Sequence, residues 1–493
     1  MDLLKGDRVY FIGIKGTGMC ALAELMHDQG ILVSGSDTNE VFYTDSILQE
    51  LKIPYHETFD ASHITNPDLV VFSAAYSEET NPEITEAKKK GIRVQKYTEA
   101  LGDYSAKFDS TGIAGVHGKT TTTALVGTLL KAVKMPVQVL AGSAVSTFDA
   151  AHGERSTLCL GNKYFVAETC EYRKHFLSFH PQRIVLTSVE SDHQDYFPAY
   201  GDIREAFMEY GRLLPDNGEL IYCADDPGAS EVALALKKEK SGLKLIPYGF
   251  SAEGDFAIEE YQVKNERIVM RLRSFPVEFK LRIPGRHTAL NAAAAIALTS
   301  VLVGKEFGTG QNDGWDEEKK NSLIKALEEF SGSRRRSEIV GEAGRILFMD
   351  DYGHHPTAIR MTLQGLKEFY PRRRLFLSFM SHTYTRTAAL LDEFAVSFDR
   401  ADLIIFHKIY ASARESYNGG VSGWTLFEKV RENLKRAEGD RLFYTEEPEA
   451  AFDLVKGILK PGDLFITMGA GDNWKLGNKL FNYYRGKECG GSE

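Results

Sequence analysis

The residue types best suited to chemistry form one short stretch, Gly115-Val116-His117-Gly118-Lys119-Thr120-Thr121. A strand-like run, 111–114, leads into it, and a helical pattern begins at Thr120. A strand, a tight glycine turn and a helix N-terminus direct backbone N–H groups at an anion. Lys119 would neutralise charge on the β- and γ-phosphates of ATP, and the hydroxyl of Thr120 or Thr121 would hold Mg²⁺. Because Ile113 replaces the first glycine of the full phosphate-loop pattern, the alternative is a glycine turn with a solvent-exposed lysine.

Acidic and imidazole side chains follow the next two expected strands. Glu168 ends the run 165–167, Glu171 comes three residues later, and His193 follows the run 184–186. Ligands of a parallel sheet lie beyond the carboxyl ends of its strands, so Glu168 and His193 should approach the phosphate loop. A carboxylate and a neutral imidazole could complete a magnesium site there, although histidine is an unusual ligand for so hard an ion. The alternative is capping and surface ion pairing.

A third cluster, Asp350 to Pro356, combines two carboxylates, two imidazoles and a phenol directly after the strand 346–349. It predicts a metal site or an acid–base site, the alternative being a helix cap with Pro356 in the first turn. Arg386 follows the next strand and could hold a carboxylate with its two-pronged guanidinium. The arginines 334–336 could clamp ATP phosphates, or could belong to a solvated linker.

Near the N-terminus, Gly13, Gly16 and Gly18 follow the apolar run 8–12, and Asp37 ends the next strand-like run about twenty residues later. This pattern is similar to a dinucleotide-binding fingerprint with altered spacing. It predicts a site for the diphosphate of a nucleotide. The alternative is a tight turn between a strand and a helix, with Asp37 as a helix cap.

The elements that must position these residues alternate between strand-like and helical stretches, which predicts an α/β fold. The 493 residues are long enough for three domains. We expect an N-terminal Rossmann-like domain at 1–106, a central P-loop-type ATP-binding domain with a parallel sheet at 107–332, and a C-terminal Rossmann-like domain at 333–493. The stretch 254–283 is expected to form an antiparallel insertion.

The composition limits the classes of function. A formal charge of −10 argues against general nucleic-acid binding, which normally requires a basic surface. Five cysteines without a C-x-x-C pair suit a reducing compartment. The first residues lack the pattern of a signal peptide, and no run of about 18 apolar residues predicts a membrane span. We therefore expect a cytoplasmic protein, a monomer or weak dimer that binds neither nucleic acid nor membrane.

Together these motifs resemble those of the Mur ligases. Residues 115–122 (GVHGKTTT) are similar to the family's G-T-H-G-K-T-T-T loop, and residues 13–19 are similar to its G-x-x-G-x-G-M. Residues 168–176 (ETCEYRKHF) resemble E-A-C-E-Y-R-R-H-F, and residues 350–357 match D-D-Y-G-H-H-P-T. The resemblance extends over nearly the whole chain, with the motifs in the expected order.

The resemblance implies an ATP-dependent ligase of peptidoglycan precursor synthesis. ATP would phosphorylate the carboxylate of UDP-N-acetylmuramate, and the amine of L-alanine would attack the acyl phosphate. The implied catalytic residues are Lys119, Glu168, His193, His354 and Arg386. The implied magnesium ligands are Thr120, Glu168 and His193. Besides residues 115–121, the implied ATP-binding residues are His287, Asn291 and Arg335. The amino acid would contact Tyr352, His354 and Arg386. The UDP moiety would contact Gly13, Ile14, Lys15, Gly16, Thr17, Gly18, Ser36, Asp37 and Ser73.

Three positions depart from the family pattern: Thr288 and Ser188 each replace an asparagine, and Thr383 replaces an arginine. The carbamylated lysine of several sister ligases has no counterpart, because no lysine occurs between His193 and Lys237. Two alternative functions remain, a ligase that attaches a preformed tripeptide to the same nucleotide and a nucleotide-binding regulator without catalysis. A dehydrogenase would leave the phosphate loop without a role.

Overall fold

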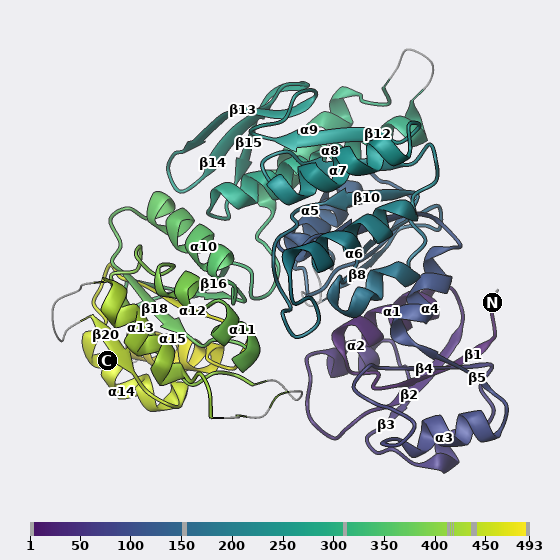
Figure 1. The fold of residues 1–493 in the computed structure, drawn as a ribbon, viewed down its shortest axis with the longest axis horizontal. Helices are drawn as coiled ribbons and strands as arrows, with labels where there is room; N and C mark the ends of the chain where they lie inside the picture. Colours follow the sequence, from purple (N-terminus) through teal and green to yellow (C-terminus); the bar gives the residue numbers. More distant parts are fainter. Residues whose placement is uncertain are drawn as a thin grey trace.

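A computed structural model describes residues 4–149, 155–308, 313–411, 415, 417, 419–434 and 441–489. The chain forms three β-sheets in sequence order, each covered by helices, and Figure 1 shows the middle sheet with its helices between the other two units. The predicted α/β class and three-domain architecture are confirmed. The fold is described below only as far as it positions the candidate site.

The first sheet is parallel, with strand order β3-β2-β1-β4-β5. Its strands are β1 (Arg8–Ile12), β2 (Leu32–Ser36), β3 (Tyr55–His56), β4 (Leu69–Phe72) and β5 (Arg93–Lys96). Its helices are α1 (Thr17–Asp28), α2 (Thr44–Glu50), η1 (Ala61–His63), α3 (Pro82–Lys89) and α4 (Tyr97–Ser105). The strand order reverses between β1 and β4, where open α/β sheets bind their ligands. The glycine-rich turn after β1 lies at this point.

The middle sheet has ten strands in the order β15-β14-β13-β12-β11-β10-β6-β9-β7-β8. The strands are β6 (Asp109–Ala114), β7 (Val137–Leu140), β8 (Thr157–Cys159), β9 (Tyr164–Glu168), β10 (Arg183–Leu186), β11 (Glu219–Cys223), β12 (Lys244–Gly249), β13 (Phe256–Val263), β14 (Ile268–Leu272) and β15 (Phe275–Leu281). From β7 through β9, β6, β10 and β11 to β12 the pairs are parallel. Strands β13 to β15 pair antiparallel, which confirms the predicted antiparallel insertion.

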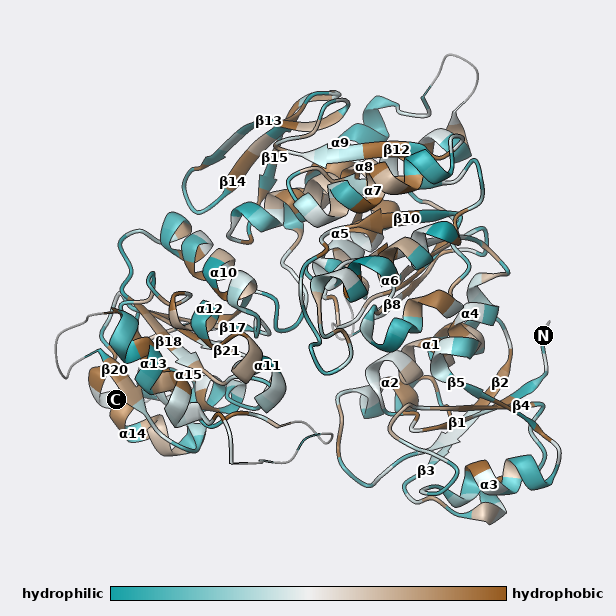
Figure 2. Cartoon of the chain, in the orientation of Figure 1, coloured by the Kyte–Doolittle hydropathy of each residue, from teal (hydrophilic) through white to brown (hydrophobic). Residues whose placement is uncertain are grey.

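The helices of the middle unit include an apolar core helix. They are α5 (Lys119–Ala132), η2 (Tyr172–Ser178), α6 (Tyr200–Arg212), α7 (Pro227–Glu239), α8 (Arg286–Phe307) and α9 (Glu317–Glu329). Helix α8 is long and apolar enough to cross a membrane by length and composition alone. Its alanine-rich middle, 292–298, is fully buried within the protein, as expected for a helix that is apolar on all sides. Figure 2 shows the apolar colour concentrated in the strands and in inward-facing helix surfaces.

The C-terminal sheet has the order β16-β17-β21-β18-β19-β20, antiparallel only at the β16–β17 pair among the described strands. The strands are β16 (Glu338–Ala343), β17 (Ile346–Asp351), β18 (Leu375–Phe379), β19 (Leu403–Phe406), β20 (Leu442–Tyr444) and β21 (Leu464–Met468). The helices are α10 (Pro356–Phe369), α11 (Tyr384–Ala389), α12 (Leu391–Ala395), α13 (Gly423–Leu434), η3 (Pro448–Ala451), α14 (Phe452–Ile458) and α15 (Trp474–Cys489). The fully buried, apolar strands β17, β18 and β21 fix the positions of the polar residues that follow β17 and β18.

Candidate active site

The phosphate loop connects β6 to α5 as the sequence predicts. Gly118 is the N-cap of α5 with φ +82°, and a Cβ there would lie 2.6 Å from Asn291 Oδ1. Only glycine is suited to this position, because both the left-handed backbone and the close approach exclude a side chain. The backbone N–H of His117 donates to Ser188 Oγ at 2.8 Å. The serine that departs from the family pattern therefore supports the loop directly.

Lys119 is the first residue of α5 and points back over the loop. Its ammonium donates to the Gly115 carbonyl oxygen and lies 2.8 Å from Glu171 Oε2. Burial acts to lower the pKa of Lys119, but the neighbouring Glu171 carboxylate outweighs it, and the pKa is raised. The pKa of Glu171 is lowered, because Lys119 and His193 outweigh the effect of burial. Lys119 is therefore a fixed cation at the helix N-terminus, where the phosphates of a nucleotide would lie.

The two glutamates after β9 have different partners. Thr120 Oγ1 lies 3.1 Å from Glu168 Oε1, while the other oxygen of Glu168 accepts the backbone N–H of Gly142 at 2.9 Å. Glu171 instead contacts Lys119 and lies 3.3 Å from His193 Nε2. The hydroxyl and carboxylate oxygens of Thr120 and Glu168 are the donor type that Mg²⁺ prefers. The structure thus brings Glu168, rather than Glu171, to the loop hydroxyl.

The segment that follows β10 contacts both the phosphate loop and the C-terminal unit. Ser188 contacts the phosphate loop, Glu190 Oε1 lies 2.6 Å from His117 Nε2, and Asp192 pairs with Arg386 of the C-terminal unit. These three residues are every second residue of the segment. We call residues 187–193 the connecting segment, because they join the nucleotide loop to the C-terminal domain.

Arg386 lies on α11 and is almost completely buried. Its Nε and one terminal nitrogen lie 2.9 and 2.8 Å from Asp192 Oδ1. Burial acts to raise the pKa of Asp192, but the guanidinium holds it well below its usual range. The N-cap of α11 is Thr383, whose hydroxyl accepts the Arg386 N–H at 3.4 Å. Thr383, which stands where the family pattern has an arginine, thus helps to position Arg386.

His354 lies in the same corner of the C-terminal domain. Its ring centroid is 5.4 Å from that of His382 and 5.1 Å from that of Tyr352. Burial, with the nearby Arg386 cation, lowers the pKa of His354 well below its usual value. Nδ1 lies 2.9 Å from the Tyr352 carbonyl oxygen, so the neutral ring places its hydrogen there and presents Nε2 as an acceptor. The structure therefore brings together Tyr352, His354 and Arg386, the three residues expected to contact the amino acid.

Arg335, the one of three consecutive arginines expected to bind ATP, does not reach the phosphate loop in this structure. Arg335 Nε pairs with Asp350 at 2.8 Å, and its terminal nitrogen donates to Gly469 O at 2.7 Å. Arg336 instead donates to Thr120 Oγ1 at 3.4 Å. The backbone at Arg335 is left-handed, with φ +60°. No feature of the three-arginine motif distinguishes its members.

The residues expected near adenine lie at the start of α8. Asn291 Oδ1 lies 3.3 Å from Thr122 Oγ1 beside the loop. Within the described residues, the enclosed Nδ1 of His287 has no hydrogen-bond partner, and burial lowers the pKa of this histidine to about 4. Thr288 donates to the Pro284 carbonyl oxygen at 2.9 Å. The hydroxyl of Thr288, which stands where the family pattern has an asparagine, is therefore hydrogen-bonded to the backbone just before the helix.

The N-terminal glycine loop is organised around Asp37. Asp37 Oδ2 accepts the backbone N–H of Lys15 at 2.7 Å, and the buried Lys15 ammonium lies 3.0 Å from Asp45. Ser36 donates to the buried Glu83, and the backbone N–H of Ser73 donates to Ile12 O at 3.0 Å. The structure thus gathers the predicted UDP-binding residues around one loop.

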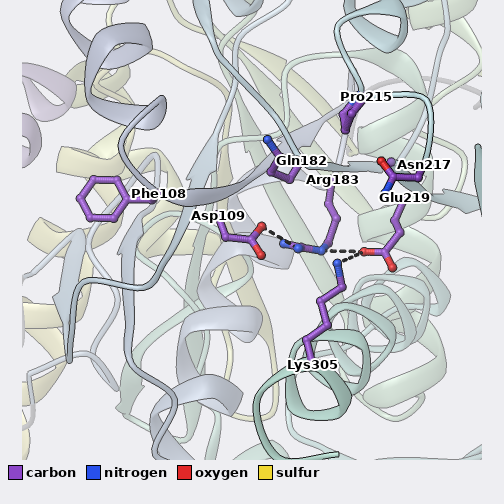
Figure 3. Close-up of a pocket in the computed structure, with 9 residues that line it drawn as sticks. Phe108, Asp109, Gln182, Arg183, Pro215, Asn217, Glu219 and Lys305 are labelled. Carbon is purple, nitrogen blue, oxygen red and sulfur yellow. Dashed lines mark hydrogen bonds and ion pairs between the residues drawn. The ribbon is translucent and has the colours of Figure 1, made fainter.

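A polar pocket of about 360 Å³ lies elsewhere on the middle sheet. Figure 3 shows Arg183 between Asp109 and Glu219, with Lys305 on the same glutamate. Asp109, Arg183 and Glu219 stand at the amino ends of β6, β10 and β11, the opposite end from the phosphate loop, and Lys305 lies on α8. Their charges are paired with one another, so this pocket is not the nucleotide site.

The fold and the site define a three-domain α/β enzyme built around a phosphate loop. Comparison with family models matches residues 8–109 to the Mur ligase family, catalytic domain, residues 113–299 to the Mur ligase middle domain, and residues 335–471 to the Mur ligase, glutamate ligase domain. The chain belongs to the Mur ligase family, as the sequence motifs predict.

Individual relatives agree with this assignment. The chain is 50% identical to UDP-N-acetylmuramate–L-alanine ligase of Treponema pallidum over 98% of both chains, and 36% identical to that of Borreliella afzelii over 95% of this chain and 97% of the relative. The structure of UDP-N-acetylmuramate-alanine ligase from Thermotoga maritima has a TM-score of 0.75 at 24% identity, covering 97% of this chain and 99% of that one. A murein peptide ligase from Psychrobacter arcticus has a TM-score of 0.64 at 23% identity, covering 97% and 98%. Both structures share the fold.

Proposed function

We propose that this chain is the ATP-dependent ligase that joins L-alanine to the carboxylate of UDP-N-acetylmuramate in peptidoglycan precursor synthesis. The observation that carries the proposal is the 50% identity to the Treponema pallidum ligase over nearly the full length of both chains. The site supports it, because a phosphate loop, a fixed lysine and a carboxylate-binding arginine lie on the facing sides of two domains.

Phosphoryl transfer takes place at the phosphate loop. An oxygen of the muramate carboxylate attacks the γ-phosphorus of ATP, the bond to the β-phosphate oxygen breaks, and ADP leaves. Lys119 and the N–H groups at the start of α5 stabilise negative charge on the phosphoryl oxygens, which is the main protein contribution to this reaction. The loop residues 115–121 hold the phosphates, and His287 and Asn291 hold the adenine. Arg336, which reaches Thr120, takes the place beside ATP that the sequence assigned to Arg335.

Mg²⁺ would fit the oxygen donors of Thr120 and Glu168. His193, the third expected ligand, lies beside Glu171 in this structure, 3.3 Å from its carboxylate. When bound, the ion supplies charge neutralisation between the β- and γ-phosphates. Glu168 is held for this role by the Gly142 N–H, which orients one of its oxygens and leaves the other toward Thr120.

Amide formation takes place on the C-terminal side. Arg386 binds the carboxylate of L-alanine through its guanidinium, and Tyr352 lines the site. The alanine ammonium loses one proton to solvent, and the neutral Nε2 of His354 accepts a hydrogen bond from the amine and orients it. The free amine then attacks the carbonyl carbon of the acyl phosphate, the carbon–oxygen bond to phosphate breaks, and inorganic phosphate leaves with the second proton of the amine.

The three units divide the work among them. Residues 1–106 hold the UDP moiety at the turn 13–18 with Ser36, Asp37 and Ser73, residues 107–332 hold ATP, and residues 333–493 hold the amino acid. We place the enzyme in the cytoplasm, a compartment that suits its free cysteines. We expect it to be a monomer or weak dimer.

The test is release of phosphate from ATP in the presence of UDP-N-acetylmuramate and one acceptor at a time. We expect turnover with L-alanine and slower turnover with L-serine or glycine. Turnover only with a preformed tripeptide would show that the tripeptide, and not L-alanine, is the acceptor. Binding of both nucleotides without turnover of any acceptor would identify a regulator.

A further inference from the structure

Three side chains that could bind a metal lie between the phosphate loop and the C-terminal domain, and the proposed mechanism gives these side chains no role. His117, Glu190 and His355 each offer one ligand atom, and these three atoms lie within 4.8 Å of one another. We propose that this cluster is a binding site for a transition-metal ion of the Zn²⁺ type. The site shares no residue with the proposed magnesium ligands.

The distances between donor atoms suit a small tetrahedral ion. Zn²⁺ binds nitrogen and oxygen at about 2.0–2.2 Å, so donor atoms around it stand roughly 3.3 Å apart. His117 Nε2 lies 3.3 Å from His355 Nδ1 and 2.6 Å from Glu190 Oε1. The shorter distance must widen by about 0.7 Å when an ion enters. Glu190 has room for this movement, because 29% of its side chain is exposed.

His355 is held in the tautomer that a metal requires. Its Nε2 lies 3.3 Å from the Ser191 carbonyl oxygen, so the hydrogen belongs on Nε2 and the lone pair on Nδ1. Donation of the second ring nitrogen to a backbone carbonyl is typical of metal-binding histidines. Burial lowers the pKa of His355 to about 4, so the ring is neutral at pH 7. The Thr357 N–H also approaches Nδ1, at 3.3 Å, and would give way to the ion.

Glu190 has a supporting contact of the same kind. Its Oε2 accepts the hydroxyl hydrogen of Thr357 at 3.0 Å, which leaves Oε1 directed at His117. Hydrogen bonds of this type orient ligating carboxylates. Two imidazoles and one carboxylate favour Zn²⁺ or Co²⁺ over Mg²⁺, which prefers oxygen donors alone.

The location gives such an ion a structural consequence. His117 belongs to the phosphate loop, Glu190 to the connecting segment, and His355 is the N-cap of α10 in the C-terminal domain. A bound ion would therefore tie two domains together through the loop that holds ATP. Its fourth coordination position would face the partly exposed side of the cluster, where 25% of the His117 side chain is accessible.

Co²⁺ binding to the full-length protein tests the site, because tetrahedral Co²⁺ has strong visible absorption that octahedral Co²⁺ lacks. The titration is done without nucleotide and with excess Mg²⁺, which occupies the oxygen-donor site. We expect one equivalent of tetrahedral Co²⁺, displaced by Zn²⁺. Absence of this absorption in the wild-type protein would overturn the proposal.

Three variants test the ligand assignment without removing the fold. His355→Asn keeps an N-cap side chain on α10, and Glu190→Gln keeps the size of the glutamate; each should abolish the tetrahedral absorption. Thr357→Val, which removes only the supporting hydroxyl, should weaken Co²⁺ binding about 10- to 100-fold, and Thr357→Ser should restore it. The exposed His180 provides the matched control, since His180→Ala should bind Co²⁺ like the wild type. Retention of the signal in both His355→Asn and Glu190→Gln would place the ion elsewhere and refute the site.

Discussion

The buried pair between Lys119 and Glu171 allows a specific prediction about how ATP stabilises the protein. Replacing Glu171 by Gln leaves the Lys119 ammonium beside a neutral amide, in a place where only 13% of the lysine side chain is exposed. Removing one partner of a buried ion pair typically costs 3–5 kcal/mol. Because the Gly115 carbonyl oxygen remains as an acceptor, we expect about 3 kcal/mol of lost unfolding free energy in the absence of nucleotide.

Bound ATP should reduce this loss, because its phosphates offer Lys119 the negative charge that Glu171 supplied. ATP should therefore stabilise Glu171→Gln more than the wild type, as judged by the shift in the urea midpoint with and without a non-hydrolysable ATP analogue. The double variant Lys119→Met/Glu171→Gln is the control, since it contains neither charge. It should be more stable than Glu171→Gln alone.

The pair also sets a pH dependence. The pKa of Glu171 is depressed in the folded state, so its contribution is present above the ordinary value of 4.5 and is lost as the pH falls through the lower folded value. The pKa of Lys119 is raised, so its contribution is present below 10.5 and is lost as the pH rises through the higher folded value. The stability difference between wild type and Glu171→Gln should be constant near pH 7 and shrink in acid. Equal midpoints at pH 7, or equal stabilisation of both proteins by nucleotide, would refute the reasoning.

Three further predictions concern catalysis. Lys119→Ala should lower kcat about 10²- to 10³-fold, measured by phosphate release, because the loop loses its phosphoryl-stabilising cation; near-normal turnover would remove Lys119 from the mechanism. Arg386→Lys keeps the charge but loses the two-pronged geometry, so KM for L-alanine should rise at least about tenfold, well beyond any change in KM for ATP; an equal rise in both would indicate a general structural role. Ser188→Ala removes the acceptor of the His117 N–H and should cost about 1 kcal/mol of ATP affinity, measured by calorimetry, with Ser188→Asn restoring it; unchanged affinity in Ser188→Ala would show that the loop holds its shape without this bond.

Much of the fold was predictable because its signals are local. The strand, glycine turn and helix around Lys119 follow one another in sequence, and the rule that ligands lie at the carboxyl ends of parallel strands places Glu168 near the loop. The division of roles between Glu168 and Glu171 was not predictable, because both glutamates follow the same strand and only the packing of η2 turns one toward Lys119.

Other parts of the site depend on contacts that no local pattern encodes. The choice between Arg335 and Arg336 rests on a left-handed residue inside a run of identical side chains. The pair between Asp192 and Arg386 joins residues 194 positions apart in different domains. The convergence of His117 and His355 likewise requires the two domains to meet. Sequence motifs identify such residues singly but do not show which of them touch.

The connecting segment has a consequence for the order in which substrates bind. Ser188 contacts the backbone of the ATP loop, and four residues later Asp192 holds the arginine proposed to bind L-alanine. Because the stretch is short, we expect a ligand that shifts one end to change the contacts at the other and so to couple the affinities for ATP and L-alanine. Such coupling is reciprocal, since each ligand must alter the binding of the other by the same factor. We therefore expect the selectivity for the amino acid to depend on whether the nucleotide is bound.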